Sequence, residues 1–324
     1  MKISVAMCTY NGERFLKEQI DSILAQTVSV QEIVICDDGS NDKTLEILQE
    51  YFNQFPTIFR IYQNENTLKS VKNFEKAISL CTGEITFLCD QDDYWYPEKV
   101  KTTIQYFTDH ETCTVLCSNG IAIDEHSNEI KNRFIIWDVF ARFIEETSNY
   151  TFFNFLTQKG NFATGATMAF KSSIKPIILP IPEIKDFHHD EYIALVASAT
   201  DSIHFINKKL IKYRIHESQQ VGGIAFLMSE HKFEDILHYF KWNSNTKETD
   251  LKTLKSRIKS QIEWYNTYFP FYKKKINAVA LELISDCFFR ALNNNVEKIK
   301  ELYPLKYKIL ALTDKILGKR QLRK

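Results

Sequence analysis

The 324-residue sequence is poor in the residues that mark disordered or fibrous chains, with only 9 glycines and 7 prolines. It also lacks an excess of either charge, because 41 basic residues balance 41 acidic ones, which gives no general reason to expect nucleic acid as a partner. Apolar residues make up 44% and charged residues 25%, as in soluble globular proteins. Folded structure around a large core is therefore expected over nearly the whole chain.

Long hydrophobic runs and paired cysteines are also missing. The apolar run from Ile3 to Met7 is too short for the core of a signal peptide, and no uninterrupted apolar stretch is long enough to span a bilayer. The seven cysteines are an odd number, and no CxxC pattern occurs. These absences predict free thiols in a reducing compartment, and hence a cytoplasmic protein.

The first third of the chain alternates β-branched runs with amphipathic stretches, which is typical of a parallel sheet with helices on both faces. The predicted elements, strand and helix in turn, span residues 3–7, 13–24, 32–36, 43–52, 59–63, 68–80 and 85–89. The middle of the chain, about residues 110–222, mixes short strands with an aromatic-rich stretch at 134–155. We expect mixed sheet and loops over this whole part. Beyond residue 223 the periodicity is helical. We therefore expect an α/β domain over 1–222 and a helical region over 223–324.

Three predicted strands end in polar segments, TYNG at 9–12, DDGSND at 37–42 and DQDD at 90–93. Ligands of open parallel sheets bind beyond the carboxyl ends of the strands, so a site is expected where these segments converge. The middle segment can be a plain turn followed by a helix cap, since Asp, Gly and Ser favour both. Alternatively, the carboxylate of Asp38 accepts hydrogen bonds from a base or a ribose.

The third polar segment places three carboxylates in four residues, at Asp90, Asp92 and Asp93. Such carboxylates repel one another unless a cation lies between them. Oxygen ligands of this kind suit Mg²⁺ or Mn²⁺, which commonly complete their coordination with diphosphate oxygens. A solvated loop leading into a helix near Pro97 is the alternative, and the position directly after an apolar strand makes it the less favoured one.

In this order, the segments resemble the nucleotide-sugar-binding half of family 2 glycosyltransferases, which have the GT-A fold. The resemblance rests on SVAMCTYN at 4–11, QT at 26–27, EIVICDDGS at 32–40, residues 64–74, GEI at 83–85 and the Asp90-x-Asp92 pair. It implies that Asp90 and Asp92 hold Mn²⁺ or Mg²⁺ together with the diphosphate of a UDP or dTDP sugar. Cys8 stands where many relatives have Pro or Thr. The expected donor contacts are Cys8, Thr9, Asn11, Glu13, Asp38, Lys72, Asp90, Gln91 and Trp95.

Two of these donor contacts have a simple structural alternative. Lys72 could neutralise a phosphate, but a lysine on a helix is more often a solvated surface residue. Trp95 could line the site as a platform for a sugar or a base, although aromatic residues that follow a strand more often pack against the sheet.

Later segments resemble a bacterial subgroup described as rhamnosyltransferase-like, through TGATMAF at 164–170, HHD at 188–190 and YRIH at 213–216. The resemblance implies that Asp190 is the general base and that His216 helps to bind the metal or the diphosphate. Without it, Asp190 is an ordinary helix N-cap and His216 a loop residue. The adjacent histidines point apart, which disfavours a shared ion, so acceptor contact is expected instead. The expected acceptor contacts are Gly165, Ala166, His188 and His189.

The function expected from the resemblance is inverting, metal-dependent sugar transfer to a saccharide or lipid-linked saccharide of a bacterial surface polysaccharide. Residues 1–110 would form the nucleotide-sugar-binding half of a GT-A domain, and residues 111–222 the acceptor half. One alternative is a non-catalytic scaffold of the same fold. A nucleotidyltransferase is less favoured, because the sequence has no Gly-rich, basic N-terminal loop for a triphosphate.

The end of the chain is basic and amphipathic, with eight basic residues against two acidic ones from Lys300 to Lys324. Apolar residues are interleaved with these charges. Such a helix can lie on an anionic membrane, here the inner face of the cytoplasmic membrane. Alternatively, its apolar face packs on the domain.

Overall fold

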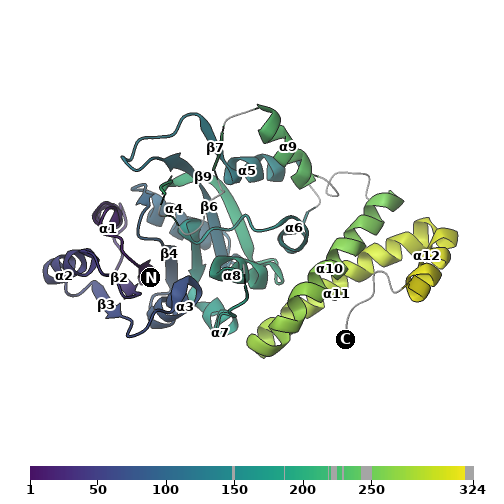
Figure 1. Cartoon of the computed structure of the whole chain (residues 1–324), viewed down its shortest axis with the longest axis horizontal. Coiled ribbons are helices and arrows are strands. Elements are labelled where there is room, and N and C mark those ends of the chain that lie inside the picture. Colours follow the sequence, from purple (N-terminus) through teal and green to yellow (C-terminus); the bar gives the residue numbers. More distant parts are fainter. Residues whose placement is uncertain are drawn as a thin grey trace.

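The computed structural model of the chain describes residues 1–147, 150–185, 187–217, 219, 225–227, 230–241 and 250–317. The first third of the chain alternates strands and helices as the periodicity predicts (Figure 1). These elements are β1 (Ile3–Thr9), α1 (Leu16–Leu24), β2 (Glu32–Asp37), α2 (Thr44–Gln54), β3 (Phe59–Gln63), α3 (Lys69–Leu80), β4 (Ile85–Cys89), β5 (Tyr94–Trp95) and α4 (Lys99–Asp109).

Within the described residues the main sheet has eight strands in the order β3-β2-β1-β4-β8-β6-β9-β5. The strands of its second half are β6 (Val115–Ile123), β8 (Met168–Lys171) and β9 (Ile203–Arg214). Strands β1 to β4 are parallel, β8 is antiparallel to both β4 and β6, β9 is parallel to β6, and β5 is antiparallel to β9. The carboxyl ends of β1, β2 and β4 therefore meet at one edge, and β8 brings the middle of the chain next to β4.

Side chains of the central strands alternate between two apolar layers. Val5 and Met7 of β1 point into a cluster with residues of α1, α2 and α4. Ala6 points into a second cluster, which includes residues of α3 and of α8 (His189–Ser198). Burial on both faces explains why the strands are continuous apolar runs in the sequence.

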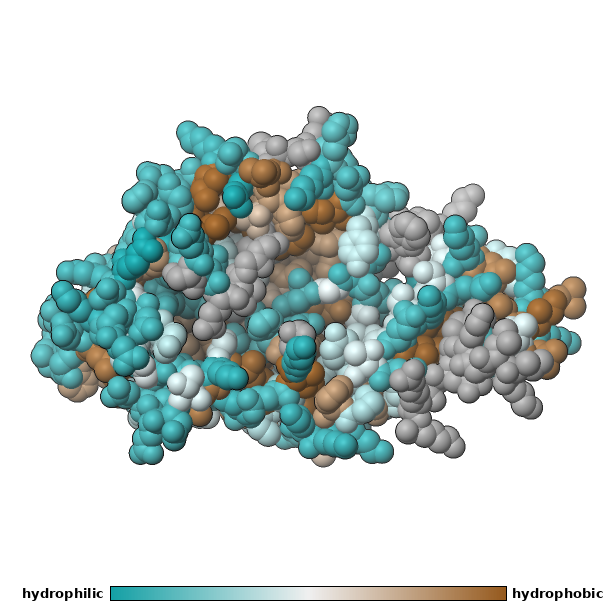
Figure 2. All heavy atoms as spheres, viewed as in Figure 1, coloured by the Kyte–Doolittle hydropathy of each residue, from teal (hydrophilic) through white to brown (hydrophobic). Residues whose placement is uncertain are grey.

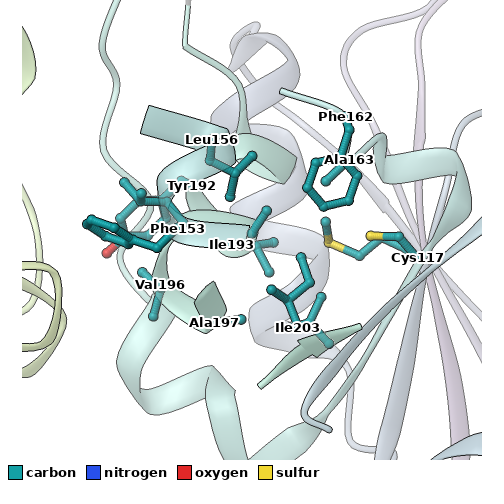
Figure 3. Close-up of a cluster of buried hydrophobic side chains, with 14 of the residues drawn as sticks. Cys117, Phe153, Leu156, Phe162, Ala163, Tyr192, Ile193, Val196, Ala197 and Ile203 are labelled. Carbon is teal, nitrogen blue, oxygen red and sulfur yellow. The ribbon is translucent and has the colours of Figure 1, made fainter. Parts of the chain in front are cut away.

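Helix α8 is buried on nearly all sides (Figure 3). Its side chains lie among those of α6 (Phe152–Lys159) and of the adjoining sheet strands. The labelled members of this cluster are Cys117, Phe153, Leu156, Phe162, Ala163, Tyr192, Ile193, Val196, Ala197 and Ile203. This packing fixes the position of the first turn of α8, which carries Asp190.

The middle of the chain contributes β6, β8 and β9 to the sheet, as expected, but its aromatic-rich stretch is mostly helical, which the expectation of sheet and loops missed. It forms a short strand β7 (Arg133–Ile135), then α5 (Ile136–Glu146) and α6. Phe140 and Phe143 of α5 lie one turn apart and are fully buried. Aromatic residues favour strands on average, but apolar residues three and four apart favour a helix that packs on a core. The connection to α8 contains the short helices η1 (Gly165–Thr167), η2 (Ser172–Ile174) and α7 (Lys175–Ile178).

The C-terminal part is helical, as expected, although its first described segment, β10 (Ala225–Leu227), is a strand paired with β7. The helices that follow are α9 (Glu230–Lys241), α10 (Leu251–Lys275), α11 (Ala278–Leu302) and α12 (Pro304–Leu317). Helix α9 packs on α5, α10 and α11 pack on each other, and α12 lies far from the sheet (Figure 1). The expected boundary between 222 and 223 falls outside the described residues. None of the described helices is long and apolar enough to cross a membrane.

Candidate active site

The loops that follow β1 and β2 are tied together by side chains that the sequence assigned to the donor. The backbone N–H of Asn41 donates to Oδ1 of Asn11 at 2.8 Å, and that of Lys43 donates to Oε2 of Glu13 at 2.9 Å. Asn11 has a φ of 49°, in the left-handed region that asparagine tolerates better than most residues. Asn11 and Glu13 therefore shape the rim of the sheet edge, and both are exposed there.

Two buried aspartates complete the turn after β2. Asp37 accepts the hydroxyl of Thr9 at 2.8 Å and the backbone N–H of Ser40 at 2.9 Å, so the Thr9 side chain is occupied within the protein. Asp38 accepts Nδ2 of Asn64 and the backbone N–H groups of Leu68 and Lys69, at 2.7–2.8 Å. A carboxylate has about four acceptor positions, so Asp38 keeps roughly one for a ligand.

Cys8 lies between the acidic groups of two loops. Burial, then the charges of Asp90 and Asp38 and the neighbouring thiol of Cys36, raise the pKa of the Cys8 thiol well above its usual value. The thiol is therefore neutral at physiological pH. Its surroundings place the ends of β1, β2 and β4 at one edge of the sheet, as the sequence predicts.

The acidic segment after β4 is linked to the segment that follows β9. Oδ2 of Asp92 lies 2.9 Å from Nε2 of His216, and both side chains are largely buried. Burial, followed by the charges of Asp92 and Asp190, raises the pKa of Asp90 to about 7. Asp90, Asp92, Asp190 and His216 are thus brought together from three segments that lie between residues 90 and 216 of the sequence.

Arg214 holds this acidic segment in place, a role that the sequence analysis missed. Its side chain is fully buried, and its Nε donates to the backbone carbonyl of Asp92 at 2.6 Å. Its backbone N–H donates to Oδ1 of Asp93 at 3.0 Å, and its guanidinium pairs with Glu18 at 2.6 Å. The sequence signal for this role was an arginine at the end of a predicted strand, two residues before His216. It connects the acidic segment to α1 and β9.

Gln91 bridges the first and third polar segments. Its side-chain amide accepts the backbone N–H of Tyr10 at 2.8 Å and donates to the carbonyl of Tyr10 at 3.0 Å. It also fills the space above Gly12, where an added Cβ would lie 2.3 Å from Oε1 of Gln91. Gln91 therefore aligns the loops, and its amide is occupied within the protein.

Asp190, the predicted base, is held by the backbone of the acceptor segment. The N–H of Gly165 donates to Oδ2 of Asp190 at 2.9 Å, and the N–H of Glu191 donates to Oδ1 at 2.7 Å. These bonds orient the carboxylate from the first turn of α8. Together with the charge effect of Asp190 on Asp90, they place the predicted base beside the predicted donor site.

The donor atoms present suit a divalent cation. Asp90 is a partly buried carboxylate next to two others, and Oδ2 of the neighbouring Asp93 has no hydrogen-bond partner among the described residues. Burial, then the charges of Asp92 and Asp90, also raise the pKa of Asp93 well above its usual value. A cation would relieve this repulsion, and carboxylates with one imidazole suit Mn²⁺ or Mg²⁺. Within the described residues, however, no three His, Cys, Asp or Glu side chains already surround a common point.

Lys99 lies beneath the acidic segment and is another residue that the sequence analysis missed. The side chain is only 1% exposed, and its Nζ donates to the carbonyl of Ala166 at 2.7 Å. The ammonium lies 4.3 Å from the centre of the Trp95 ring. Burial lowers the pKa of Lys99 to about 8, against the opposing charges of Cys89, Asp93 and Asp90. Lys99 therefore joins the start of α4 to the turn that holds Asp190.

Replacing Lys99 with Met is expected to lower kcat by about 10- to 100-fold, because a hydrogen bond to a charged group contributes about 1.5–3 kcal/mol. Methionine keeps the volume and leaves the Ala166 carbonyl without its donor. The measurement is steady-state kinetics on folded protein, with Lys101→Met, an exposed lysine of the same helix, as the control. An unchanged kcat in Lys99→Met would show that this link does not position the site.

Three expected contact residues make contacts within the protein, and for Trp95 burial in the core contradicts the expectation. Trp95 is 1% exposed and packs on Phe87 with ring centres 5.4 Å apart, so it belongs to the core and does not line the site. The ammonium of Lys72 is bound to Glu75 at 2.8 Å and to the carbonyl of Ile181 at 2.9 Å, so it is committed within the protein.

His189 is the third expected contact residue that packs within the protein. It is buried, its ring stacks on Phe74 at 3.9 Å, and burial lowers its pKa to about 4. An added Cβ on Gly165 would lie 2.9 Å from its Nε2, so the ring packs against that turn. His188, at the N-cap of α8, stays partly exposed, and Ala166 lies buried in η1.

Comparison with known proteins identifies the family of the chain. The family model for glycosyl transferase family 2 matches residues 4–175. Chondroitin synthase of Escherichia coli is 31% identical over 43% of this chain, and the match spans only 20% of that protein's length. The dTDP-rhamnosyl transferase RfbG of Shigella flexneri is 28% identical over 70% of this chain and 77% of that protein.

Among solved structures, residues 1–349 of S. aureus TarS in complex with UDP-GlcNAc share the fold. The TM-score is 0.55 at 19% identity, covering 92% of this chain and 82% of that one. At this identity the likeness shows the fold alone, and the fold is the expected GT-A architecture. With more than half of its length matched by the family model, the chain belongs to glycosyl transferase family 2.

Proposed function

We propose that the chain is a metal-dependent, inverting glycosyltransferase. It moves a sugar from a UDP-hexose or dTDP-rhamnose donor to a saccharide of a bacterial surface polysaccharide. The observation that carries the proposal is the carboxylate of Asp190, which Gly165 holds at 2.9 Å and which lies close enough to raise the pKa of Asp90. A fixed carboxylate beside a set of metal-binding carboxylates is what base-assisted sugar transfer requires. Among the relatives, one carries the name of a dTDP-rhamnosyl transferase, and a protein of the same fold binds UDP-GlcNAc.

The metal-binding residues in this proposal are Asp90, Asp92 and His216. When bound, a divalent cation supplies positive charge that stabilises the diphosphate oxygens as their bond to the sugar breaks. Asp190 accepts the proton of the acceptor hydroxyl while that oxygen attacks the anomeric carbon from the face opposite the diphosphate. One displacement of this kind inverts the anomeric configuration. The GT-A domain then spans residues 1–222, with the donor held by 1–110 and the acceptor by 111–222.

The donor base and ribose are assigned to the rim formed by Cys8, Asn11, Glu13 and Asp38. Asp38 retains acceptor capacity, and the rim lies at the carboxyl edge of the parallel strands, where ligands of such sheets bind. The acceptor is assigned to the opposite side, next to Gly165 and His188. A lipid-linked saccharide as acceptor would place the enzyme at the inner face of the cytoplasmic membrane.

Calorimetry tests whether this edge of the sheet is a donor site. UDP and dTDP are titrated into the purified chain with Mn²⁺, with Mg²⁺ and with chelator. Binding that requires the metal supports the site and identifies the nucleotide. Failure of both nucleotides to bind folded protein under every metal condition would overturn the proposal and favour a scaffold of the same fold.

A further inference from the structure

Helix α12 packs on the rest of the chain with a different face from the one that its sequence pattern suggests. Tyr303, just before the helix, and Tyr307 and Leu310 within it are partly buried against the core cluster that includes residues of α11. These residues repeat at intervals of four and three, which places them on one side of the helix. The ammonium of Lys306 lies 5.7 Å from the ring centre of Tyr303, and that of Lys300 lies 5.4 Å from the ring centre of Tyr307.

The apolar stripe of α12 is left on the outside. Leu305 is 76% exposed, Ile309 62% and Leu312 59%. Their spacing of four and three residues puts all three on a single face, turned away from the tyrosines. Figure 2 shows hydrophobic residues at this end of the molecule, far from the sheet edge that carries the acidic segment. The pattern of the sequence left packing on the domain and contact with a membrane both open, and the described side chains of this stripe do not pack on the domain.

Basic side chains border the stripe on both flanks. Viewed down the helix, Lys306 follows Leu305 by about 100° and Lys308 precedes it by about 60°, since each residue turns the helix by about 100°. Both lysines are exposed. The sequence beyond the described helix adds Lys319, Arg320, Arg323 and Lys324. An apolar stripe flanked by positive charge matches a surface that is apolar inside and anionic at its boundary.

We propose that the outer face of α12 docks on an anionic lipid surface. Leu305, Ile309 and Leu312 enter the boundary between headgroups and acyl chains. Lys306 and Lys308 meet the negative headgroups. A second copy of the chain fits this face less well, because two such helices would bring lysines of like charge together along the seam. The proposal concerns this face alone and does not depend on sugar transfer.

Vesicle co-sedimentation of the full chain tests this docking. The probes are vesicles of phosphatidylcholine alone and vesicles that also contain phosphatidylglycerol, at low and at high salt. The chain is expected to sediment with the anionic vesicles only, and less at high salt. Lys306→Glu with Lys308→Glu is expected to weaken this binding by at least about tenfold, as is Leu305→Ser with Ile309→Ser. The matched control is Lys273→Glu with Lys274→Glu at the exposed end of α10, which should bind like the parent chain.

Two further readouts separate the outcomes. Thermal unfolding should be unchanged in the α12 variants, because the replaced side chains are exposed, and nucleotide affinity should also be unchanged. Equal binding of the parent and both double variants would overturn the proposal, as would the absence of binding to anionic vesicles. A dimer in sedimentation velocity that Leu305→Ser with Ile309→Ser dissolves, without vesicle binding, would assign the face to a second copy instead. If the parent chain bound no nucleotide, that result would count against the proposed function. It would not affect the proposal that α12 docks on lipid.

Discussion

Replacing Asp190 with Asn is expected to lower kcat by about 10² to 10⁴-fold, the usual contribution of a positioned general base. The asparagine oxygen can still accept the N–H of Gly165, so the turn that holds the site keeps its bond. What is lost is the ability to take the proton of the acceptor hydroxyl. Nucleotide affinity should stay nearly the same, because the donor rim is formed by other residues. Steady-state rates together with calorimetry measure the two effects separately.

Glu191→Gln is the matched control for this experiment. Glu191 is the next residue of the same helical turn, and burial followed by the charge of Asp190 raises its pKa to about 7. On pKa alone it is therefore also a candidate base, while the hydrogen bond from Gly165 favours Asp190. A loss of kcat in Glu191→Gln equal to that in Asp190→Asn would contradict the assignment, and so would an Asp190→Asn variant with full activity.

Replacing Asp92 with Ala is expected to abolish metal-dependent binding of the nucleotide. The change deletes a predicted metal ligand and leaves His216 without the carboxylate that lies 2.9 Å from its Nε2. Loss of a residue that merely supports a metal ligand typically weakens metal affinity by about 10- to 100-fold, so loss of a ligand should cost at least that much. Mn²⁺ binding is measured by electron paramagnetic resonance, and nucleotide binding by calorimetry with and without the metal.

Asp109→Ala serves as the control for Asp92→Ala, since Asp109 is an exposed carboxylate at the end of α4. It should bind Mn²⁺ and nucleotide like the parent chain. If Asp92→Ala retained the Mn²⁺ affinity and metal-dependent nucleotide binding of the parent, Asp92 would not be a metal ligand, and the account of the acidic segment would need another set of residues.

The alternation of strands and helices in the first third of the chain could be predicted from sequence because each element carries its own periodicity. The acidic segment was also visible, since three carboxylates directly after an apolar strand conflict with ordinary core packing. The convergence of the polar segments followed from one topological rule about the ends of parallel strands. These inferences need only local pattern and strand direction.

Inferences about individual side chains were less successful, because they depend on contacts between distant segments. The ammonium of Lys72 is directed to Glu75 and Ile181, and nothing in its own helix indicates the carbonyl of residue 181. Burial of Trp95 depends on its packing with Phe87 and Lys99. From sequence alone, Lys99 is expected to be a surface lysine at the start of a helix. Its burial depends on the hydrogen bond to the Ala166 carbonyl, which belongs to a distant segment.

The arrangement of the site explains why the middle of the chain was hard to interpret. Strand β8 enters antiparallel between β4 and β6, so the turn at Gly165 lies next to the acidic segment although the two are far apart in sequence. The bond from Lys99 to Ala166 then connects the donor half with the acceptor half, and the bond from Gly165 to Asp190 fixes the neighbouring turn within the acceptor half. A pattern within one element cannot reveal such a connection.

The central claim is that this edge of the sheet transfers a sugar, and the release of nucleoside diphosphate tests it most directly. Purified chain is incubated with UDP-hexoses and dTDP-rhamnose, with Mn²⁺ or with chelator, and the freed UDP or dTDP is quantified beside Asp190→Asn. The account predicts metal-dependent release from one donor, faster with a saccharide acceptor and lost in the variant. Metal-dependent binding of a nucleotide without release from any of these donors would contradict it and identify the chain as a binding protein of the same fold.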